Sequence, residues 1–230
     1  MHAYTPRTIA QLVEILQPAQ PVQVGAIQKV HNRMFETGKP LYGNFQALPQ
    51  GAALSNPVAQ QGAASTAVFL PDRVQFREEL TSLTIEDFAS RVLQVTSDVA
   101  ELAGQQVFSA QAVTLRMLVN PRHYDDSRLL LKSELFGFQG RLTDFDQDPE
   151  LFGFRMVFPP TKENPARYAL RVESFSQDPR SMFVEVTGQF GGTVVQRGLQ
   201  PLADNVLATY RFATERAFNF LAGFDQRQEA

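Results

Sequence analysis

The sequence predicts an α+β protein with antiparallel β-sheets, packed helices and pseudo-repeated halves. Three extended segments precede a long amphipathic helix, and this order occurs twice, first before Gly104 and again before Gly223. Strands that precede a helix, without strict alternation of the two, favour an antiparallel sheet with helices on one face. We therefore predict a first half over residues 1–104 and a second half over 105–230, which pack together as one unit.

The extended segments are recognised as apolar and β-branched runs that lie between turn-forming residues. They are predicted over 22–35, 43–54 and 66–79 in the first half, and over 152–158, 167–175 and 182–190 in the second. A further apolar strand is predicted over 112–119. Residues 9–16 have the pattern of one short amphipathic helix that Pro18 ends.

The long helix of the first half is predicted over 84–103. Its apolar residues recur at steps of three and four, which places them on one helical stripe. These residues are Phe88, Val92, Val95, Val99 and Leu102. Thr84 and Asp87 have the spacing of a capping box, and Gly104 suits the left-handed position that ends a helix.

The long helix of the second half is predicted over 201–222 and is richer in aromatic residues than a helix with one buried face requires. Its rings are Tyr210, Phe212, Phe218, Phe220 and Phe224. They spread over more than one helical face, so either a neighbouring segment of the chain or a second subunit covers them. We predict Tyr210, Phe212, Phe218 and Phe224 as interface residues of a homo-oligomer.

One face of the predicted sheet is apolar and the other is charged. The charged positions are Arg116, Arg155, Arg171, Glu173 and Glu185. Opposite charges on adjacent strands would form a solvated ladder of ion pairs. If the two halves fold this face inward, the same five residues would instead bind an anionic or zwitterionic ligand in a polar cavity.

Two connecting segments have distinct compositions. Residues 46–66 consist of Ala, Gln, Gly, Ser and Pro with few bulky residues and no charge, which predicts a flexible loop. The segment before a predicted helix over 127–136 contains His123, Asp125 and Asp126. These side chains are candidates for metal binding or acid–base catalysis, but acidic residues also stabilise a helix N-terminus.

Composition narrows the function classes. A hydrophobic content of 43% and nineteen Phe can form a sizeable core. A net charge of −3 gives no general attraction to nucleic acid or to an anionic membrane. The chain has no cysteine, which excludes disulfides and thiolate chemistry and suits a cytoplasmic protein. The N-terminal segment is too short and too polar for a signal peptide or a membrane span.

The sequence contains no recognised catalytic signature. The zinc-protease, phosphate-loop, nucleophile-elbow and dinucleotide-binding patterns are all absent. We therefore predict no cofactor and no resident metal.

Residues 113–120, Val-Thr-Leu-Arg-Met-Leu-Val-Asn, follow the first long helix. This segment resembles the Leu-Arg-Tyr-x-Asn strand of a sporadically distributed bacterial family of uncharacterised proteins of similar length. That family also ends in a long helix, as this chain does, but Met117 stands here where the family has an aromatic residue. The resemblance implies no catalytic residues, because the family has no established activity.

These observations predict a non-catalytic binding or assembly protein that associates with itself. One alternative is a metal-dependent phosphoester hydrolase that uses His123, Asp125 and Asp126. A third hypothesis is a receptor for a small anionic ligand in a cavity lined by the charged face of the sheet.

Overall fold

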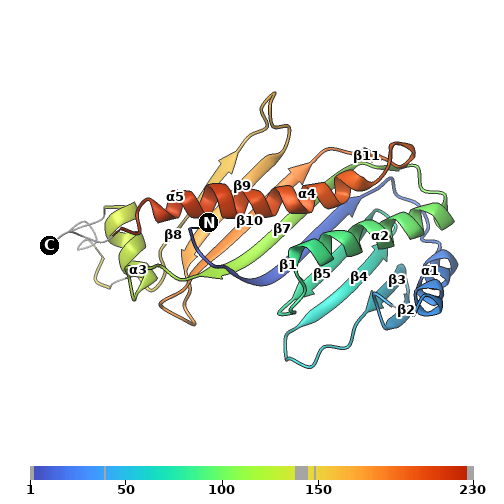
Figure 1. The fold of residues 1–230 in the computed structure, drawn as a ribbon, viewed down its shortest axis with the longest axis horizontal. Helices are drawn as coiled ribbons and strands as arrows, with labels where there is room; N and C mark the ends of the chain where they lie inside the picture. The colour runs from blue at the N-terminus through green and yellow to red at the C-terminus, as the bar shows by residue number, and fades with distance from the viewer. Residues whose placement is uncertain (1–2, 39, 138–144, 148, 227–230) are drawn as a thin grey trace.

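A single antiparallel sheet of nine strands organises the described part of the chain (Figure 1). This computed structural model describes residues 3–226 except 39, 138–144 and 148. From edge to edge, the strands are β2 (Asn44–Leu48), β3 (Gly51–Ser55), β4 (Ala64–Leu70), β5 (Arg73–Glu79), β1 (Arg7–Leu16), β7 (Ala110–Val119), β10 (Met182–Phe190), β9 (Arg167–Ser174) and β8 (Gly153–Phe158). Two short strands, β6 (Val107–Phe108) and β11 (Thr193–Val194), form a second sheet. The predicted α+β class with antiparallel sheets is confirmed.

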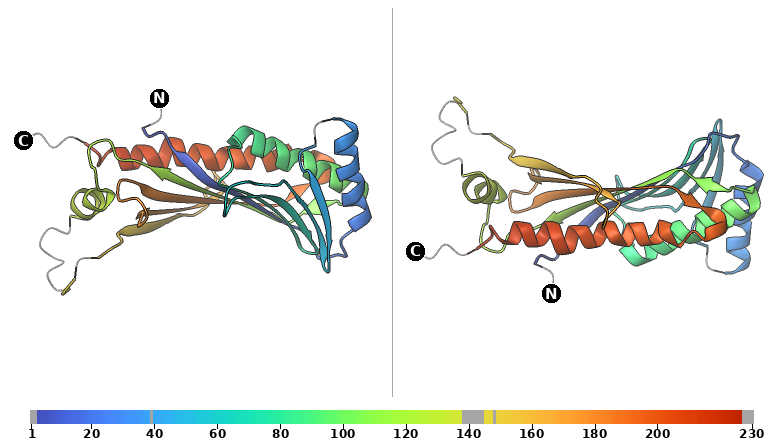
Figure 2. Two further views of the ribbon diagram at one scale, coloured as in Figure 1. Left: turned by 90° about the horizontal axis from the view of Figure 1, so that it is seen from below. Right: turned by 90° about the horizontal axis from the view of Figure 1, so that it is seen from above.

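Two long helices lie on the same side of the large sheet (Figure 2). One is α2 (Ile85–Ala103); the other begins as α4 (Gln200–Arg211) and continues through a π-helical segment (Phe212–Ala217) into α5 (Phe218–Ala222). Within this layer, α2 packs against α4. The shorter α1 (Val24–Glu36) packs beside α2 at the β2 end of the sheet. None of the described helices has the length and apolar character needed to cross a bilayer.

The core lies between the sheet and this helix layer, because alternate residues of each strand turn toward the helices. Val13 and Ile15 on β1, and Val113 and Leu115 on β7, are all buried in this way. Since β1 pairs with β7, strands from both predicted halves belong to one sheet, and one continuous core joins them.

The predicted ends of the first long helix agree with the structure. The backbone N–H of Asp87 donates to Thr84 Oγ1 at 3.1 Å, and Thr84 Oγ1 donates to the Asp87 carboxylate at 2.8 Å. Gly104 ends the helix with φ of 67°, a conformation that glycine adopts without a steric penalty.

Two N-terminal predictions were wrong. Residues 9–16, predicted as a helix, belong to β1, and residues 22–35, predicted as a strand, are largely the helix α1. Short apolar runs fit both periods, and the position of β1 between β5 and β7 selects the strand. In α1, Ala26, Ile27 and Val30 form the buried face of a helix.

The predicted extended segment 43–54 forms two strands, β2 and β3, and these correct the overlapping prediction of a flexible loop over 46–66. Ala52 and Leu54 are fully buried on β3. Gly51 belongs there because a Cβ atom at this position would lie 1.9 Å from the carbonyl oxygen of Phe69. Small residues therefore allow close strand packing here, where sequence composition indicated a loop. The segment 66–79 is likewise two strands, which Pro71 and Asp72 separate.

Candidate functional site

No described helix covers the side of the sheet opposite the helix layer (Figure 2). This open face contains a hollow of about 500 Å³. The hollow spans β4, β5, β1 and β7. Its floor is formed by Leu12, Thr66, Val68, Gln75, Ala112 and Thr114, and its charged side chains are Glu14, Arg77 and Glu79. A concave surface with a mixed floor and a few polar groups is typical of ligand and partner sites.

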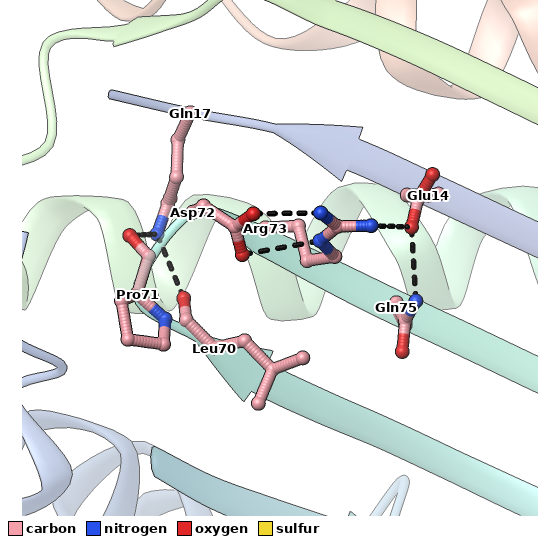
Figure 3. Close-up of polar contacts among 7 residues, drawn as sticks. All are labelled: Glu14, Gln17, Leu70, Pro71, Asp72, Arg73 and Gln75. Atoms are coloured by element: carbon pink, nitrogen blue, oxygen red, sulfur yellow. Dashed lines mark hydrogen bonds and ion pairs between the residues drawn. The ribbon is translucent and has the colours of Figure 1, made fainter. Parts of the chain in front are cut away.

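The charged groups beside the hollow already have partners (Figure 3). Arg73 Nη1 donates to Glu14 Oε1 at 2.8 Å, and Arg73 Nη2 donates to Asp72 Oδ2 at 2.6 Å. Gln75 Nε2 donates to the same Glu14 oxygen at 2.9 Å. The bonds from Arg73 hold the pKa of Asp72 below its ordinary value. Arg77 pairs with Glu79 in the same way. The hollow therefore suits an uncharged ligand better than an anion.

The five charged residues predicted as a ligand site lie on this open face, but none of them lines the hollow. Arg116 Nε donates to Glu185 Oε2 at 2.7 Å, and Arg171 Nε donates to Glu173 Oε1 at 2.6 Å. Arg155 lies opposite Arg171 in the register of β8 and β9. The structure thus places four of these residues in ion pairs on an accessible surface.

The candidate catalytic residues occupy different local environments. Asp126 caps α3 (Ser127–Leu129), since its carboxylate accepts the backbone N–H of Arg128 at 2.8 Å. Hydrogen bonds from the Arg128 side chain hold the pKa of Asp126 below its ordinary value. Asp125 is fully exposed and lies 3.6 Å from Arg180. Metal binding by His123 and these carboxylates stays a prediction. Among the residues that the structure describes, no group of three or more acidic or histidine side chains could hold a metal ion.

A buried carboxylate that sequence analysis did not select organises the same loop. Asp225 accepts the Tyr4 hydroxyl at 3.0 Å and the backbone N–H groups of Arg122 and His123 at 2.6 and 3.0 Å. Burial and then the Asp225 charge raise the pKa of Tyr4. This carboxylate joins both ends of the described chain to the loop that follows β7, which indicates a structural role.

A second missed group is the buried ion pair at the β2 end. Arg91 Nη1 on α2 donates to Glu78 Oε1 on β5 at 2.5 Å, and Ser65 Oγ donates to the same oxygen at 2.8 Å. The Arg91 guanidinium lies over the Tyr42 ring, 5.1 Å from its centre. Glu78 and Ser65 are buried and Arg91 is largely so, and the pair links α2 to β5 inside the protein.

The predicted interface residues of the last helix divide into inner and outer rings. Phe218 is fully buried against Tyr4, with ring centres 6.0 Å apart, so it lies in the core of the chain itself and is not accessible to a second subunit. Phe212 stacks on Tyr168 at 4.3 Å, and Tyr210 is half-buried. Phe224 contacts Phe220, which was not among the predicted interface residues.

The outer rings of the last helix join those of the edge strand β8. Phe158 contacts Phe212 at 5.3 Å between ring centres, and Phe154 contacts Phe220 at 6.2 Å. Phe224 extends the second group through Phe220. We call these five residues the aromatic strip. Phe158 is 38% exposed and Phe220 is 40% exposed, so the strip is accessible along the β8 edge.

No family model matches the chain, and no curated protein matches it significantly. The fold and its surfaces define an α+β protein with one covered sheet face, one open sheet face and an apolar sheet edge.

Proposed function

We propose that this protein is a non-catalytic binding or assembly protein that associates with itself at the β8 end of the sheet. The observation that carries the proposal is the exposure of apolar side chains that lie together there. Phe158 on β8 is 38% exposed and contacts Phe212. Phe220 on α5 is 40% exposed and contacts Phe154 on the same side of β8. Exposed apolar groups that gather on one surface favour association, whereas isolated ones need no explanation.

The proposed association is tested by comparing Phe220→Ser with Phe35→Ser. Phe35 on α1 is 50% exposed at the other end of the sheet, so its replacement removes a comparable apolar area elsewhere. We expect Phe220→Ser to weaken a dimer at least tenfold in sedimentation equilibrium, and Phe35→Ser to leave it unchanged. Equal dissociation constants for the two variants would contradict the proposal.

A pseudo-repeat of the two halves is also proposed. In each half, a first strand at the sheet centre is followed by a helix, further strands and a long helix. A buried glutamine of each first strand donates to a carbonyl at the beginning of that half's long helix: Gln11 Nε2 to Leu83 at 2.7 Å, and Gln111 Nε2 to Leu202 at 2.9 Å. These matching bonds support the repeat. The lack of cysteine supports a cytoplasmic location.

The proposed kinship with the bacterial family is supported by one feature alone. The segment that carries the resemblance forms β7, a central strand of the sheet.

The hollow on the open sheet face supports a second candidate function, the binding of an uncharged small ligand. Its volume of about 500 Å³ suits a small molecule. A thermal-shift screen of uncharged and zwitterionic compounds tests this function, with Val68→Trp as the variant that fills the floor. A compound that stabilises the unmodified protein and leaves Val68→Trp unchanged would place its site in the hollow. A screen without any stabilising compound would count against this candidate.

A further inference from the structure

The outer side of β8 carries backbone groups that can pair with another strand. β8 is the last strand of the sheet order, and no described strand pairs with its outer side. The backbone N–H of Ser174 donates to the carbonyl of Phe152 at 2.8 Å, which sets the phase of the ladder between β8 and β9. Hydrogen-bonded pairs recur at every second residue of an antiparallel ladder. Phe154, Met156 and Phe158 therefore bond to β9.

By the same alternation, the backbone N–H and C=O groups of Gly153, Arg155 and Val157 point outward from the edge of the sheet. The backbone groups at such an edge form hydrogen bonds either with water or with an added strand. A second copy of the chain offers the same row of donors and acceptors in the same order, and antiparallel pairing about a twofold axis matches each donor to an acceptor.

We propose that two copies pair β8 to β8 in antiparallel orientation, with the twofold axis at Met156, so that the two sheets continue into each other. This inference rests on the proposed self-association and specifies its geometry. Arg155 then pairs with Val157 of the partner subunit and Val157 with Arg155 of the partner subunit. These two reciprocal pairs supply four backbone hydrogen bonds, and Met156 faces its own copy across the axis.

The register about Met156 is selected by charge and by strand length. An axis at Arg155 would place the guanidinium groups of the two copies opposite each other. Arg155 already lies opposite Arg171 in its own sheet, so this register would add a further like charge. Like charges in directly opposite positions destabilise a sheet. An axis at Phe154 would pair only residues 153–155 of the strand, because β8 begins at Gly153. The Met156 axis pairs residues 154–158.

This register also covers the exposed apolar groups. Phe154 and Phe158 lie on the helix side of β8. In this register, Phe154 would lie opposite Phe158 of the partner subunit, and Phe158 opposite Phe154 of the partner subunit. The aromatic strips of the two copies would then meet on that side of the joined sheet. On the open face, Val157 would lie beside the aliphatic stem of Arg155 of the partner subunit.

The first test uses a cysteine at the axis. The chain has no cysteine, so the thiol of Met156→Cys is the only one present. Residues opposite each other in a non-hydrogen-bonded pair have Cα atoms about 4.5 Å apart, within the range of a disulfide. We expect oxidised glutathione to convert Met156→Cys into a covalent dimer. Val157→Cys in the same strand and Gln46→Cys on the β2 edge are the controls, and we expect little cross-linking of either.

The second test changes the charge opposite Arg155. Val157→Glu would place a carboxylate opposite Arg155 of the partner subunit, and Val157→Lys would place a second cation there. With two such pairs in the dimer, we expect Val157→Glu to bind about fivefold more tightly than the unmodified chain and Val157→Lys about fivefold more weakly. A dimer in which the charge at 157 has no effect, or in which Met156→Cys does not cross-link above the controls, overturns this register and leaves the proposed self-association standing. A chain that is monomeric at all concentrations overturns both.

Discussion

The two edges of the sheet differ in what they present to solvent. At the β2 edge, the exposed residues include Asn44 and Gln46, and α1 packs against the strand, with the rings of His31 and Phe45 6.1 Å apart. At the β8 edge, Val157 and Phe158 are exposed. Polar residues at an edge discourage pairing with another chain, whereas an apolar edge favours it. The difference supports the β8 end as the surface of the proposed association.

The largest expected loss of stability concerns Phe218, a fully buried ring of the last helix at the β8 end. Replacing Phe218 with Ala removes a fully buried ring from the contact with Tyr4, and we expect a loss of about 4 kcal/mol in the free energy of unfolding. Phe220→Ala, which alters the accessible side of the same helix, should cost less than about 1 kcal/mol. Urea denaturation of both variants under monomeric conditions measures the difference. Similar losses would show that the inner and outer rings are not distinct.

At the β2 end, stability depends on a buried ion pair. Glu78→Ala leaves the Arg91 guanidinium without its carboxylate, and we expect a loss of about 3 kcal/mol. Glu79→Ala on the open face is the matched control, because its partner Arg77 is largely solvated, and it should cost less than about 1 kcal/mol. Chemical denaturation compares the two. A loss below 1 kcal/mol in Glu78→Ala would contradict the account of this pair.

The close approach of β3 to its neighbour predicts a smaller loss. Gly51→Ala places a methyl group against the carbonyl of Phe69, so β3 must move, and we expect a cost of about 2 kcal/mol. Gly25→Ala is the control, since a Cβ atom there meets nothing within 4 Å. Hydrogen exchange of the β3 amides should increase only in Gly51→Ala. Unchanged protection would show that the packing of the strands at this end tolerates a side chain.

The smallest expected effect concerns the cap of α3. Asp126→Asn should lower stability by about 1 kcal/mol at neutral pH, because it removes the charge that Arg128 binds. The pKa of Asp126 is lowered in the folded protein. Its contribution is therefore present above the ordinary value of 3.8 and is lost as the pH falls through the lowered folded pKa.

The measurement for this cap is the difference in thermal stability between Asp126→Asn and the unmodified chain, followed from pH 7 downward. Asp125→Asn is the control, because that carboxylate is fully exposed. A difference that grew on acidification would contradict a stabilising contribution from this charge.

Local sequence signals predicted some elements well. The ends of the first long helix were predicted correctly from its apolar pattern and from its caps, Thr84 and Gly104. The strand β10 has the predicted bounds. The predicted types of β1 and α1 were reversed: β1 was predicted as a helix and α1 as a strand. Short apolar runs fit a strand as well as a helix, and the neighbouring strands decide between the two. The segment 43–54 was predicted as extended and forms β2 and β3, but the overlapping prediction of a flexible loop over 46–66 did not allow for them, because small residues that permit close strand packing also occur in loops.

The surfaces were harder to predict than the elements. The charged face was anticipated as a ladder or a cavity, and the structure shows ion pairs on an open surface. That Phe218 points inward and Phe220 outward depends on where the helix meets the sheet. The identity of β8 as an edge depends on strand order, which no local pattern contains. The contact between Tyr4 and Asp225 joins residues 221 positions apart, so no spacing in the sequence indicates it.

The central claim is that this chain associates through its apolar edge, and sedimentation velocity of the unmodified protein over a wide concentration range tests it most directly. We predict a reversible shift with concentration from a species of 25.7 kDa to one of twice that mass. The larger species should have the high frictional ratio of two molecules joined edge to edge. A single species of 25.7 kDa at every concentration would contradict the claim.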